Sequence, residues 1–306
     1  MNRWQPSRTA EYMAFFRAAE SVRPANRRLF EDRFAVRFIR PRLRWAVWLS
    51  KNPVLAAFIN WYADHRLPGA RTSAVARTRF VDDALRPSLA KGIGQLVILG
   101  AGFDCRAYRL AELQQMTVFE VDHPATLSTK LQCLRQVLPG VPEHVRFVES
   151  DFNRLGLAEA LRRAGFEPSR PAVFLWEGVT NYLTAEAVDS VLRYVACCST
   201  HSEIIFTYVH SGILDGSVDF DRGARLLQDV ARLGEPWTFG LSPARLADFL
   251  DSRGLCLDRD LSAGEYRTQY FGAAAQRMKG YEFYHIAAAH VSRGDTIVQQ
   301  QESSRA

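Results

Sequence analysis

From about residue 90 onward, short apolar runs alternate with longer amphipathic segments. Apolar runs predict strands at 96–99, 117–121, 145–148, 172–176 and 203–209. Segments with a helical period lie between them, at 125–137, 155–165 and 185–197. A short strand is predicted at 255–261 and a last apolar strand at 281–291, which together form a closing pair. The pattern is typical of an α/β fold in which a mainly parallel seven-stranded sheet carries helices on both faces.

The first third of the chain has a helical pattern throughout. Residues 9–22, 28–40 and 43–62 each repeat apolar positions with a helical period. Segment 43–62 is rich in aromatic residues, among them Trp45, Trp48 and Trp61. Packing onto the main domain is the favoured interpretation. The alternative is a lid whose aromatic face closes over an apolar or aromatic substrate.

These patterns predict two parts of unequal size. Residues 1–90 form a helical cap or lid, and residues 91–306 form the sheet domain. An irregular insertion near 211–241 interrupts that domain and contains one helix at about 222–233. Ser242 and Pro243 then open another helix, because they suit the N-cap and N1 positions. The residues after 298 are expected to be disordered.

Composition and charge narrow the class of protein. The formal net charge of +6 is uneven, because residues 1–86 hold 17 Lys and Arg against 7 Asp and Glu. These arginines are interleaved with apolar residues rather than grouped in a block, which favours amphipathic helices over a nucleic-acid surface. The five cysteines have no metal-ligand spacing and indicate reduced thiols, mostly buried. No signal core is seen, and the apolar run 45–62 is broken by Lys51 and Pro53. We therefore expect a soluble cytoplasmic protein without a membrane partner, a nucleic-acid partner or a metal.

A glycine turn follows the first strand of the sheet domain. Gly100 and Gly102 come directly after the apolar run 96–99, and Asp104 stands where a helix N-cap belongs. Strand, turn and helix form the first half of a nucleotide-type βαβ unit. Glycines permit a ligand to approach the backbone closely. Two glycines alone are a weak signal, because many tight turns of this kind hold no ligand.

Acidic residues at the ends of later strands strengthen that signal. Asp122 ends the second strand, 20 residues after Gly102, where a carboxylate accepts hydrogen bonds from ribose hydroxyls. Asp151 follows the third strand and is placed to accept from an adenine amino group, with Phe152 beside it. Glu177 directly follows the fourth strand. In open α/β sheets, this carboxyl edge is where ligands bind.

Two cofactor classes use a glycine turn together with a ribose acid. A dinucleotide needs a pyrophosphate cradle, for which the usual third glycine is missing here. S-adenosyl-L-methionine carries no phosphate and needs a cation for its carboxylate, which Arg77 supplies. The spacing therefore favours S-adenosyl-L-methionine. An NAD-linked oxidoreductase and a non-catalytic interaction protein remain as alternatives.

Several motifs resemble those of the leucine carboxyl methyltransferase family, and most closely bacterial natural-product carboxyl O-methyltransferases of the tetracenomycin type. They are Ala76-Arg77-Thr78-Arg79-Phe80 with Asp82-Asp83, Leu99-Gly100-Ala101-Gly102-Phe103-Asp104-Cys105-Arg106, Glu120-Val121-Asp122-His123-Pro124 and Glu177-Gly178-Val179-Thr180-Asn181-Tyr182-Leu183. The resemblance is clear over residues 68–185 and weak after residue 210. It implies a Rossmann-like class I methyltransferase fold with S-adenosyl-L-methionine as cofactor and S-adenosyl-L-homocysteine as product.

The resemblance also implies roles for single residues. Arg77 holds the cofactor carboxylate, and Gly100 lies against the methionine part. Asp122 takes the ribose hydroxyls, Asp151 and Phe152 lie at the adenine, and Glu177 lies near the amino group. Arg79, Asp104 and Arg106 also belong to the pattern of the family, and for them a structural role in fixing the glycine turn stays open. The helical first third corresponds to the substrate cap of the family.

The acceptor is the open question. A carboxylate is already ionised at pH 7 and needs orientation rather than a general base. Arg23, Arg71 and Tyr208 are candidates for that orientation, and Tyr12 and Tyr182 are further candidates for contact with the substrate. A phenol, amine or carbon acceptor needs a base, for which His210 and His123 are candidates. The oligomeric state cannot be read from the sequence.

Overall fold

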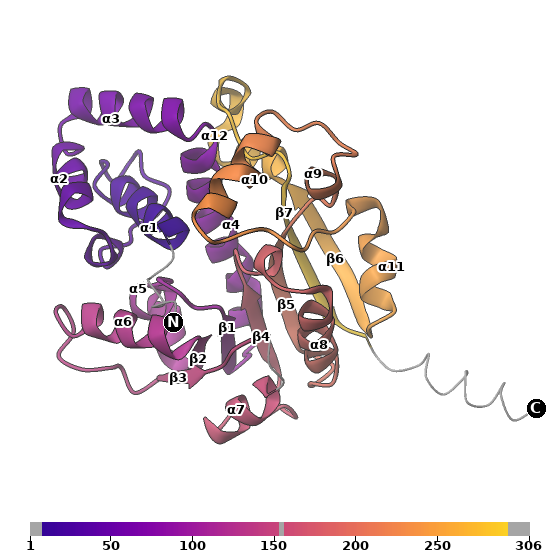
Figure 1. Ribbon diagram of the computed structural model, residues 1–306. Coiled ribbons are helices and arrows are strands. Elements are labelled where there is room, and N and C mark those ends of the chain that lie inside the picture. Colours follow the sequence, from indigo (N-terminus) through magenta and orange to yellow (C-terminus); the bar gives the residue numbers. More distant parts are fainter. Residues whose placement is uncertain (1–7, 153–155, 293–306) are drawn as a thin grey trace, which may run out of the picture.

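A seven-stranded sheet forms the centre of the computed structural model, which describes residues 8–152 and 156–292 (Figure 1). The strand order is β3-β2-β1-β4-β5-β7-β6. The strands are β1 (Gln95–Leu99), β2 (Thr117–Asp122), β3 (Val145–Glu149), β4 (Ala172–Trp176), β5 (Glu203–Val209), β6 (Leu255–Ser262) and β7 (Tyr284–Val291). Strands β1 to β5 pair in parallel, whereas β7 is antiparallel to both β5 and β6. The predicted fold class is confirmed.

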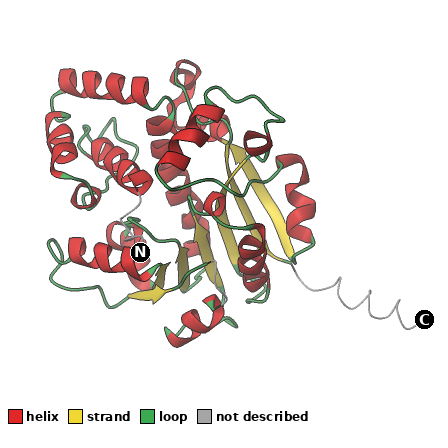
Figure 2. Cartoon of the chain, in the orientation of Figure 1, coloured by secondary structure: helices red, strands yellow, loops and turns green. Residues whose placement is uncertain are grey.

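Helices cover both faces of this sheet (Figure 2). One face packs against α7 (Leu157–Arg163), α8 (Ala185–Ala196) and α11 (Leu246–Asp251). The other packs against α4 (Ala70–Ala90) and α12 (Ala263–Phe271). Both cores are made of fully buried strand residues, because β1 and β4 bury all five of their side chains. The rigid centre of the sheet thereby fixes the carboxyl ends of β1, β2 and β4.

The remaining helices form the cap, which is the helical part of the chain before α4, and the connections between the strands. They are α1 (Arg8–Ser21), η1 (Ala35–Phe38), α2 (Pro41–Leu49), α3 (Pro53–Arg66), α5 (Arg106–Arg109), η2 (Ala111–Gln115), α6 (Pro124–Leu134), η3 (Thr180–Tyr182), α9 (Gly212–Asp215), α10 (Gly223–Arg232), η4 (Pro243–Arg245) and η5 (Gly272–Arg277). Helix α4 joins the cap to the sheet, because Ala70, Ala74 and Val75 pack in the cap core while Phe80 and Leu85 pack on the sheet.

The helix predicted over 28–40 is wrong. Most of this segment is loop, with only the short helix η1 inside it. Side chains of α1 accept the backbone hydrogen bonds that a helix would have kept internal: Leu29 N donates to Glu20 Oε1 at 2.8 Å, and Asp32 N donates to Ser21 Oγ at 2.7 Å. The loop is therefore held by polar partners rather than by helical periodicity.

The segment 43–62 also differs from its prediction. Pro53 divides it into α2 and α3, and the Asn52 side chain caps α3 by accepting from Val54 N and Leu55 N. Most of its large apolar side chains are exposed, so packing onto the main domain is wrong for them. In the described part of the chain, no helix is long and apolar enough to cross a membrane.

Smaller differences concern the cysteines and the C-terminal third. Of the five thiols only Cys105 and Cys198 are buried, so the expectation of mostly buried thiols is wrong. Helix α12 was not predicted, although Ser262 and Glu265 form a capping box at its start. The expected disorder after residue 298 falls outside the described residues.

Candidate functional site

The predicted cofactor residues lie at the carboxyl edge of β1, β2 and β4. Gly100 and Gly102 turn the chain after β1 with φ values of 69° and 39°, which favour glycine. The N–H groups of Gly100 and Ala101 both donate to Val121 O, at 2.8 and 2.9 Å. A Cβ on Gly100 would lie 2.3 Å from Val179 Cγ2, in the loop after β4. The glycine turn is thus packed tightly between β2 and that loop.

Asp122 is bonded directly to the glycine turn. Its Oδ2 accepts from Gly102 N and its Oδ1 from His123 N, both at 2.6 Å. Burial raises the pKa of this carboxyl, against the effect of the two backbone donors. The neighbouring His123 caps α6, because its Nδ1 accepts from Ala125 N.

Glu177 connects two arginines that come from different elements. Arg77 Nε, from α4, donates to Oε1 of Glu177 at 2.7 Å, and Arg106 Nη1, from α5, donates to Oε2 at 2.8 Å. Burial disfavours the ionised carboxylate, but Arg106 and Arg77 keep the pKa of Glu177 below its usual value. The Arg77 guanidinium also lies over the Tyr284 ring, 5.4 Å from its centroid. The site therefore presents a cation and an anion side by side.

Two more carboxylates complete this buried network. Asp82 Oδ1 accepts from Arg106 Nε at 2.8 Å and from Arg109 Nη2 at 2.6 Å. Asp104 forms an ion pair with Arg106, which overcomes the effect of burial and lowers the pKa of Asp104 to about 2. The network ties α4, the glycine turn and the end of β4 together.

The structural weight of Arg106 and Asp82 was underestimated from the sequence, and Lys130 was not singled out at all. Asp82 lies four residues after buried Thr78 and three before buried Leu85, so helical spacing places it on the apolar face of α4. Lys130 likewise lies between Leu127 and Leu134 on the buried face of α6. In both helices, a charged residue at a position of the apolar face was the sequence feature that could have identified the buried ion pairs.

Lys130 belongs to a second buried cluster beneath the glycine turn. Its Nζ lies 2.8 Å from Glu120 Oε2, with both side chains fully buried, and 3.4 Å from Ala101 O. The Tyr108 hydroxyl donates to the same Glu120 oxygen at 3.0 Å. Burial raises the pKa of Glu120. This cluster contacts the glycine turn through Ala101 O.

Asp151 and Phe152 follow β3, next to β2 and Asp122. The Phe152 ring packs against the core, with its centroid 6.4 Å from that of Trp176. Residues 153–155 directly after them lie outside the described part of the chain.

The two predicted catalytic residues lie apart from the ion-pair network. Tyr208 is fully buried on the α8 face of the sheet, and its hydroxyl donates to Asp260 Oδ2 at 2.8 Å. The ring of His210 lies 5.5 Å from that of Phe220, and its Nδ1 accepts from Gly212 N at 3.0 Å. Burial lowers the pKa of His210, and His285 adds to the effect.

The predicted substrate residues are distributed over the cap. Arg71 makes two bonds to Asp64, at 3.0 and 2.6 Å, and Arg23 pairs with Glu20 at 2.8 Å. Tyr12 is partly buried and packs against the cap core. Burial raises the pKa of Tyr182, which lies in η3 directly after the β4 loop. Tyr182 is therefore the member of this group that the chain brings near Glu177.

Three side chains near the network carry buried polar atoms: Nε1 of Trp237 and the amide of Asn181, which both interact with the Tyr182 side chain, and the hydroxyl of Tyr266, which has no hydrogen-bond partner among the described residues. Trp237 packs against Tyr284, with ring centroids 5.7 Å apart. Thr238 N, next to it in the chain, donates to Asn181 O at 2.8 Å. Buried polar groups are usually satisfied in native proteins. The Tyr266 hydroxyl and the polar groups beside Tyr182 are therefore candidate contacts for a polar ligand.

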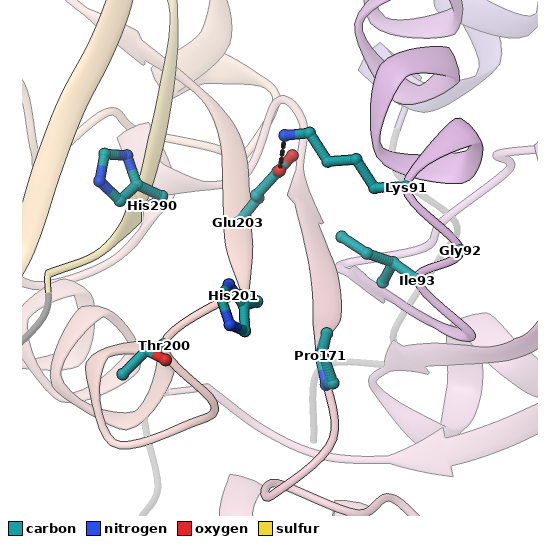
Figure 3. A pocket seen from close by; sticks show the side chains of 8 residues that line it. All are labelled: Lys91, Gly92, Ile93, Pro171, Thr200, His201, Glu203 and His290. Atoms are coloured by element: carbon teal, nitrogen blue, oxygen red, sulfur yellow. Dashed lines mark hydrogen bonds and ion pairs between the residues drawn. The ribbon is translucent and has the colours of Figure 1, made fainter.

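Two pockets are lined by residues that do not belong to the ion-pair network. One, at the amino edge of the sheet, is lined by Lys91, Gly92, Ile93, Pro171, Thr200, His201, Glu203 and His290 (Figure 3). Lys91 and Glu203 form an ion pair of 2.6 Å there. The second lies between the cap and α10, where Arg66, Arg222, Tyr281 and Phe283 are among its lining residues. Open α/β sheets bind their ligands at the carboxyl edge, so the first pocket is on the wrong side for a cofactor.

The donor set at the carboxyl edge suits an adenosyl amino acid. Asp122 offers a carboxylate for a ribose diol. Arg77 and Glu177 offer opposite charges for a zwitterion. Phe152 offers a ring near the place for a base. None of these groups requires a phosphate on the ligand.

Comparison with known proteins agrees with that geometry. A family model described as leucine carboxyl methyltransferase matches residues 10–196. A protein of Parafrankia sp. (strain EAN1pec), named "putative S-adenosyl-L-methionine-dependent methyltransferase", is 32% identical over 85% of this chain and 81% of its own. YktD of Bacillus subtilis (strain 168), with the same description, is 28% identical over 76% of this chain and 75% of its own.

Two solved structures share the fold. A "putative methyltransferase" from Thermobifida fusca has a TM-score of 0.59 and 17% identity, covering 91% of this chain and 94% of its own. A DUF574 family protein from Streptomyces avermitilis has a TM-score of 0.53 and 16% identity, covering 90% of this chain and 96% of its own.

Proposed function

Because this chain belongs to the leucine carboxyl methyltransferase family of S-adenosyl-L-methionine-dependent methyltransferases, we propose that it methylates a carboxylate oxygen of a small apolar or aromatic molecule. The resemblance of its motifs to natural-product carboxyl O-methyltransferases supports this acceptor class. The cofactor supplies an electrophilic methyl group on a sulfonium. The chain's own residues align the acceptor with that methyl group and exclude water.

On the cofactor side, the proposal assigns each charged group to one part of the ligand. Asp122 accepts from the ribose hydroxyls, and Asp151 and Phe152 lie at the adenine. Arg77 binds the amino acid carboxylate, and Glu177 binds the amino group. The 2.7 Å ion pair of Arg77 and Glu177 supports this assignment. When a zwitterion binds there, this one ion pair is replaced by two, between Arg77 and the ligand carboxylate and between Glu177 and the ligand amino group.

The observation that carries the acceptor class is the group of buried polar side chains near Tyr284. The hydroxyl of Tyr266 offers a donor without a partner among the described residues, and the indole N–H of Trp237 and the amide of Asn181 lie beside the Tyr182 side chain. Aromatic rings surround them, since Trp237, Phe283 and Tyr281 all pack against Tyr284. An aromatic carboxylate matches both features: its ring packs among these side chains, and its oxygens accept from the donors.

The protonation states of nearby groups also favour an acceptor that needs no base. Asp104 and Glu177 are held ionised in ion pairs with Arg106, so neither carboxylate is free to take up a proton. In neutral His210, Nδ1 accepts from Gly212 N, so the ring proton is on Nε2. That nitrogen is then a donor and not a base. We propose that His210 orients the acceptor, whereas Tyr208, whose hydroxyl donates to Asp260, supports the sheet.

A panel of aryl carboxylic acids with matched phenols and anilines, assayed with methyl-labelled S-adenosyl-L-methionine, tests the proposal. We expect label in the acids, in a product that releases methanol in alkali as an ester does. The rate constant should be flat between pH 6 and 9, because carboxyl groups titrate near pH 4. Trp237→Phe keeps the ring and removes the donor, and should lower kcat/KM about tenfold or more.

Two other results would each overturn the carboxylate assignment. The first is a base-stable product from the phenols with a rate that rises toward pH 10, which indicates O-methylation of a phenol. The second is label in the anilines, or on carbon. Calorimetry with S-adenosyl-L-homocysteine and with NAD, run beside these assays, reports on the cofactor independently of the acceptor.

A further inference from the structure

Helices α2 and α3, which follow each other in the chain and contact each other, expose a set of large apolar side chains, which we call the aromatic face: Trp45, Trp48, Leu49, Val54, Leu55, Phe58, Trp61 and Tyr62. Its five aromatic side chains are between 54% and 65% exposed. Helix α3 buries none of its 14 residues. In Figure 1, α2 and α3 form the outer margin of the cap, on the side away from the sheet.

The spacing of these residues places them side by side. Val54, Phe58 and Trp61 follow each other at intervals of four and three, so they share one face of α3. The Phe58 and Trp61 rings lie 5.8 Å apart, and the Trp45 and Trp48 rings 5.7 Å apart. The rings pack on each other at the surface instead of turning into the cap core.

The area of this surface is large for a protein in water. An aromatic side chain has about 150–250 Å² to bury, so five rings at more than half exposure present on the order of 500 Å². The aliphatic members add to that area. Monomeric proteins rarely expose contiguous apolar patches beyond a few hundred Å², and larger patches mark interaction sites.

The charges in the segment that carries the aromatic face are almost all positive. Residues 37–66 contain six Arg and Lys and a single acidic residue, Asp64. Asp64 is already paired with Arg71. Arg42, Lys51 and Arg66 are exposed and have no ion-pair partner among the described residues. Aromatic and apolar side chains flanked by Lys and Arg characterise helices that lie in the interface of an anionic bilayer.

We propose that the aromatic face docks on an anionic lipid surface, with its rings at the level of the headgroups and its cations against lipid phosphates. This departs from the expectation of no membrane partner, because the pattern of 43–62 did not reveal that its rings face water. The charge pattern argues against a second copy as the occupant. A second copy would bring the same positively charged segment against itself, and its one carboxylate, Asp64, is already paired with Arg71.

Flotation with vesicles tests the proposal directly. The full chain is mixed with vesicles of phosphatidylcholine and phosphatidylglycerol at 7:3, and with vesicles of phosphatidylcholine alone. We expect the anionic vesicles to carry the protein, and the neutral ones to carry at least tenfold less. The bound fraction should fall as salt is raised from 0.1 to 1 M, because the Debye length shrinks from about 10 to about 3 Å.

Surface variants locate the contact. Trp48→Ser/Phe58→Ser/Trp61→Ser should lower the partition coefficient at least tenfold, since its rings no longer enter the interface. Arg42→Gln, Lys51→Gln and Arg66→Gln should each lower it about fivefold. The matched control is Val141→Ser/Leu233→Ser, which removes exposed apolar side chains outside the cap and should leave the partition unchanged. Unchanged binding of S-adenosyl-L-homocysteine reports that each variant is folded.

Three results would overturn the proposal. One is the absence of flotation with anionic vesicles. Another is equal flotation of the three-ring variant and of the Val141/Leu233 control. The third is a dimer, seen by sedimentation without lipid, that dissociates in the three-ring variant, because the aromatic face is then an interface between two copies of this chain.

Discussion

Asp122 joins two parts of the candidate site through a single carboxylate. Its oxygens hold the N–H groups of Gly102 and His123, so the same side chain that we assign to the ribose also shapes the glycine turn. Burial already raises its pKa. A ligand diol therefore adds donors to a carboxylate whose solvation by water is limited, where hydrogen bonds to a charge are strong.

Asp122→Ala should weaken the binding of S-adenosyl-L-homocysteine by about 100-fold or more, because two hydrogen bonds to a charged group contribute about 1.5–3 kcal/mol each. Isothermal calorimetry measures the affinity, and circular dichroism should show that the chain is still folded. Asp122→Asn keeps a hydrogen-bond acceptor without the charge, so its affinity should lie between those of the unchanged protein and of the alanine variant. An unchanged affinity in the alanine variant would show that the ribose is bound elsewhere.

The ion-pair network holds three elements in register at the carboxyl edge of the sheet. Arg106 of α5 contacts Asp82 of α4, Asp104 of the turn and Glu177 after β4, and its side chain is 3% exposed. Removing one partner of a buried network leaves other charges without compensation in a poorly solvated place. The network is therefore an alignment device as well as part of a binding site.

Arg106→Met should lower the free energy of unfolding by about 3–5 kcal/mol, because Asp82, Asp104 and Glu177 lose their shared cation. Urea denaturation at pH 7 measures this change. The matched control is Arg162→Met, which removes the cation of an exposed pair with Glu159 and should show no measurable loss. Equal effects of the two variants would mean that the network adds nothing beyond a surface pair.

The sequence predicted elements well where local pattern and tertiary packing agree. Strands β1 and β4 contain continuous apolar runs, and Thr184 caps α8. The helix prediction for 28–40 was wrong because Glu20 and Ser21, which lie outside the segment, accept hydrogen bonds from its backbone N–H groups. Helix α12 was missed although its capping box, Ser262 to Glu265, is visible in the sequence.

The candidate site was predictable in part for the same reason. Spacing placed Asp122 and Glu177 at strand ends, where the fold brings them to one edge. The partners of Arg71 and Tyr208 were not predictable, because Asp64 and Asp260 meet them only through tertiary packing. The exposure of Trp61 and its neighbours was also invisible, since an apolar stripe indicates a face but not what covers it.

The cap and the sheet domain meet where two backbones approach each other closely. Gly69, at the start of α4, has a φ of 91°, and a Cβ there would lie 2.6 Å from the carbonyl carbon of Gly280. Around this contact, Thr72 Oγ1 donates to Lys279 O and Tyr281 N donates to Ser73 Oγ. The segment then continues into Phe283 and Tyr284. The position of the cap and that of the proposed acceptor residues are thus fixed together.

Gly69→Ala should therefore destabilise the whole molecule more than backbone strain alone explains. Gly92 is the control, because its φ of 78° is similar but nothing lies within 4 Å of a Cβ built there. Strain costs about 1 kcal/mol in both variants, whereas the clash in Gly69→Ala adds about 2 kcal/mol. At about 2–4 °C per kcal/mol, we expect Tm to fall by about 3 °C for Gly92→Ala and about 9 °C for Gly69→Ala. Equal shifts in thermal unfolding would show that the cap does not depend on this contact, and the acceptor residues would then have to be positioned by the sheet alone.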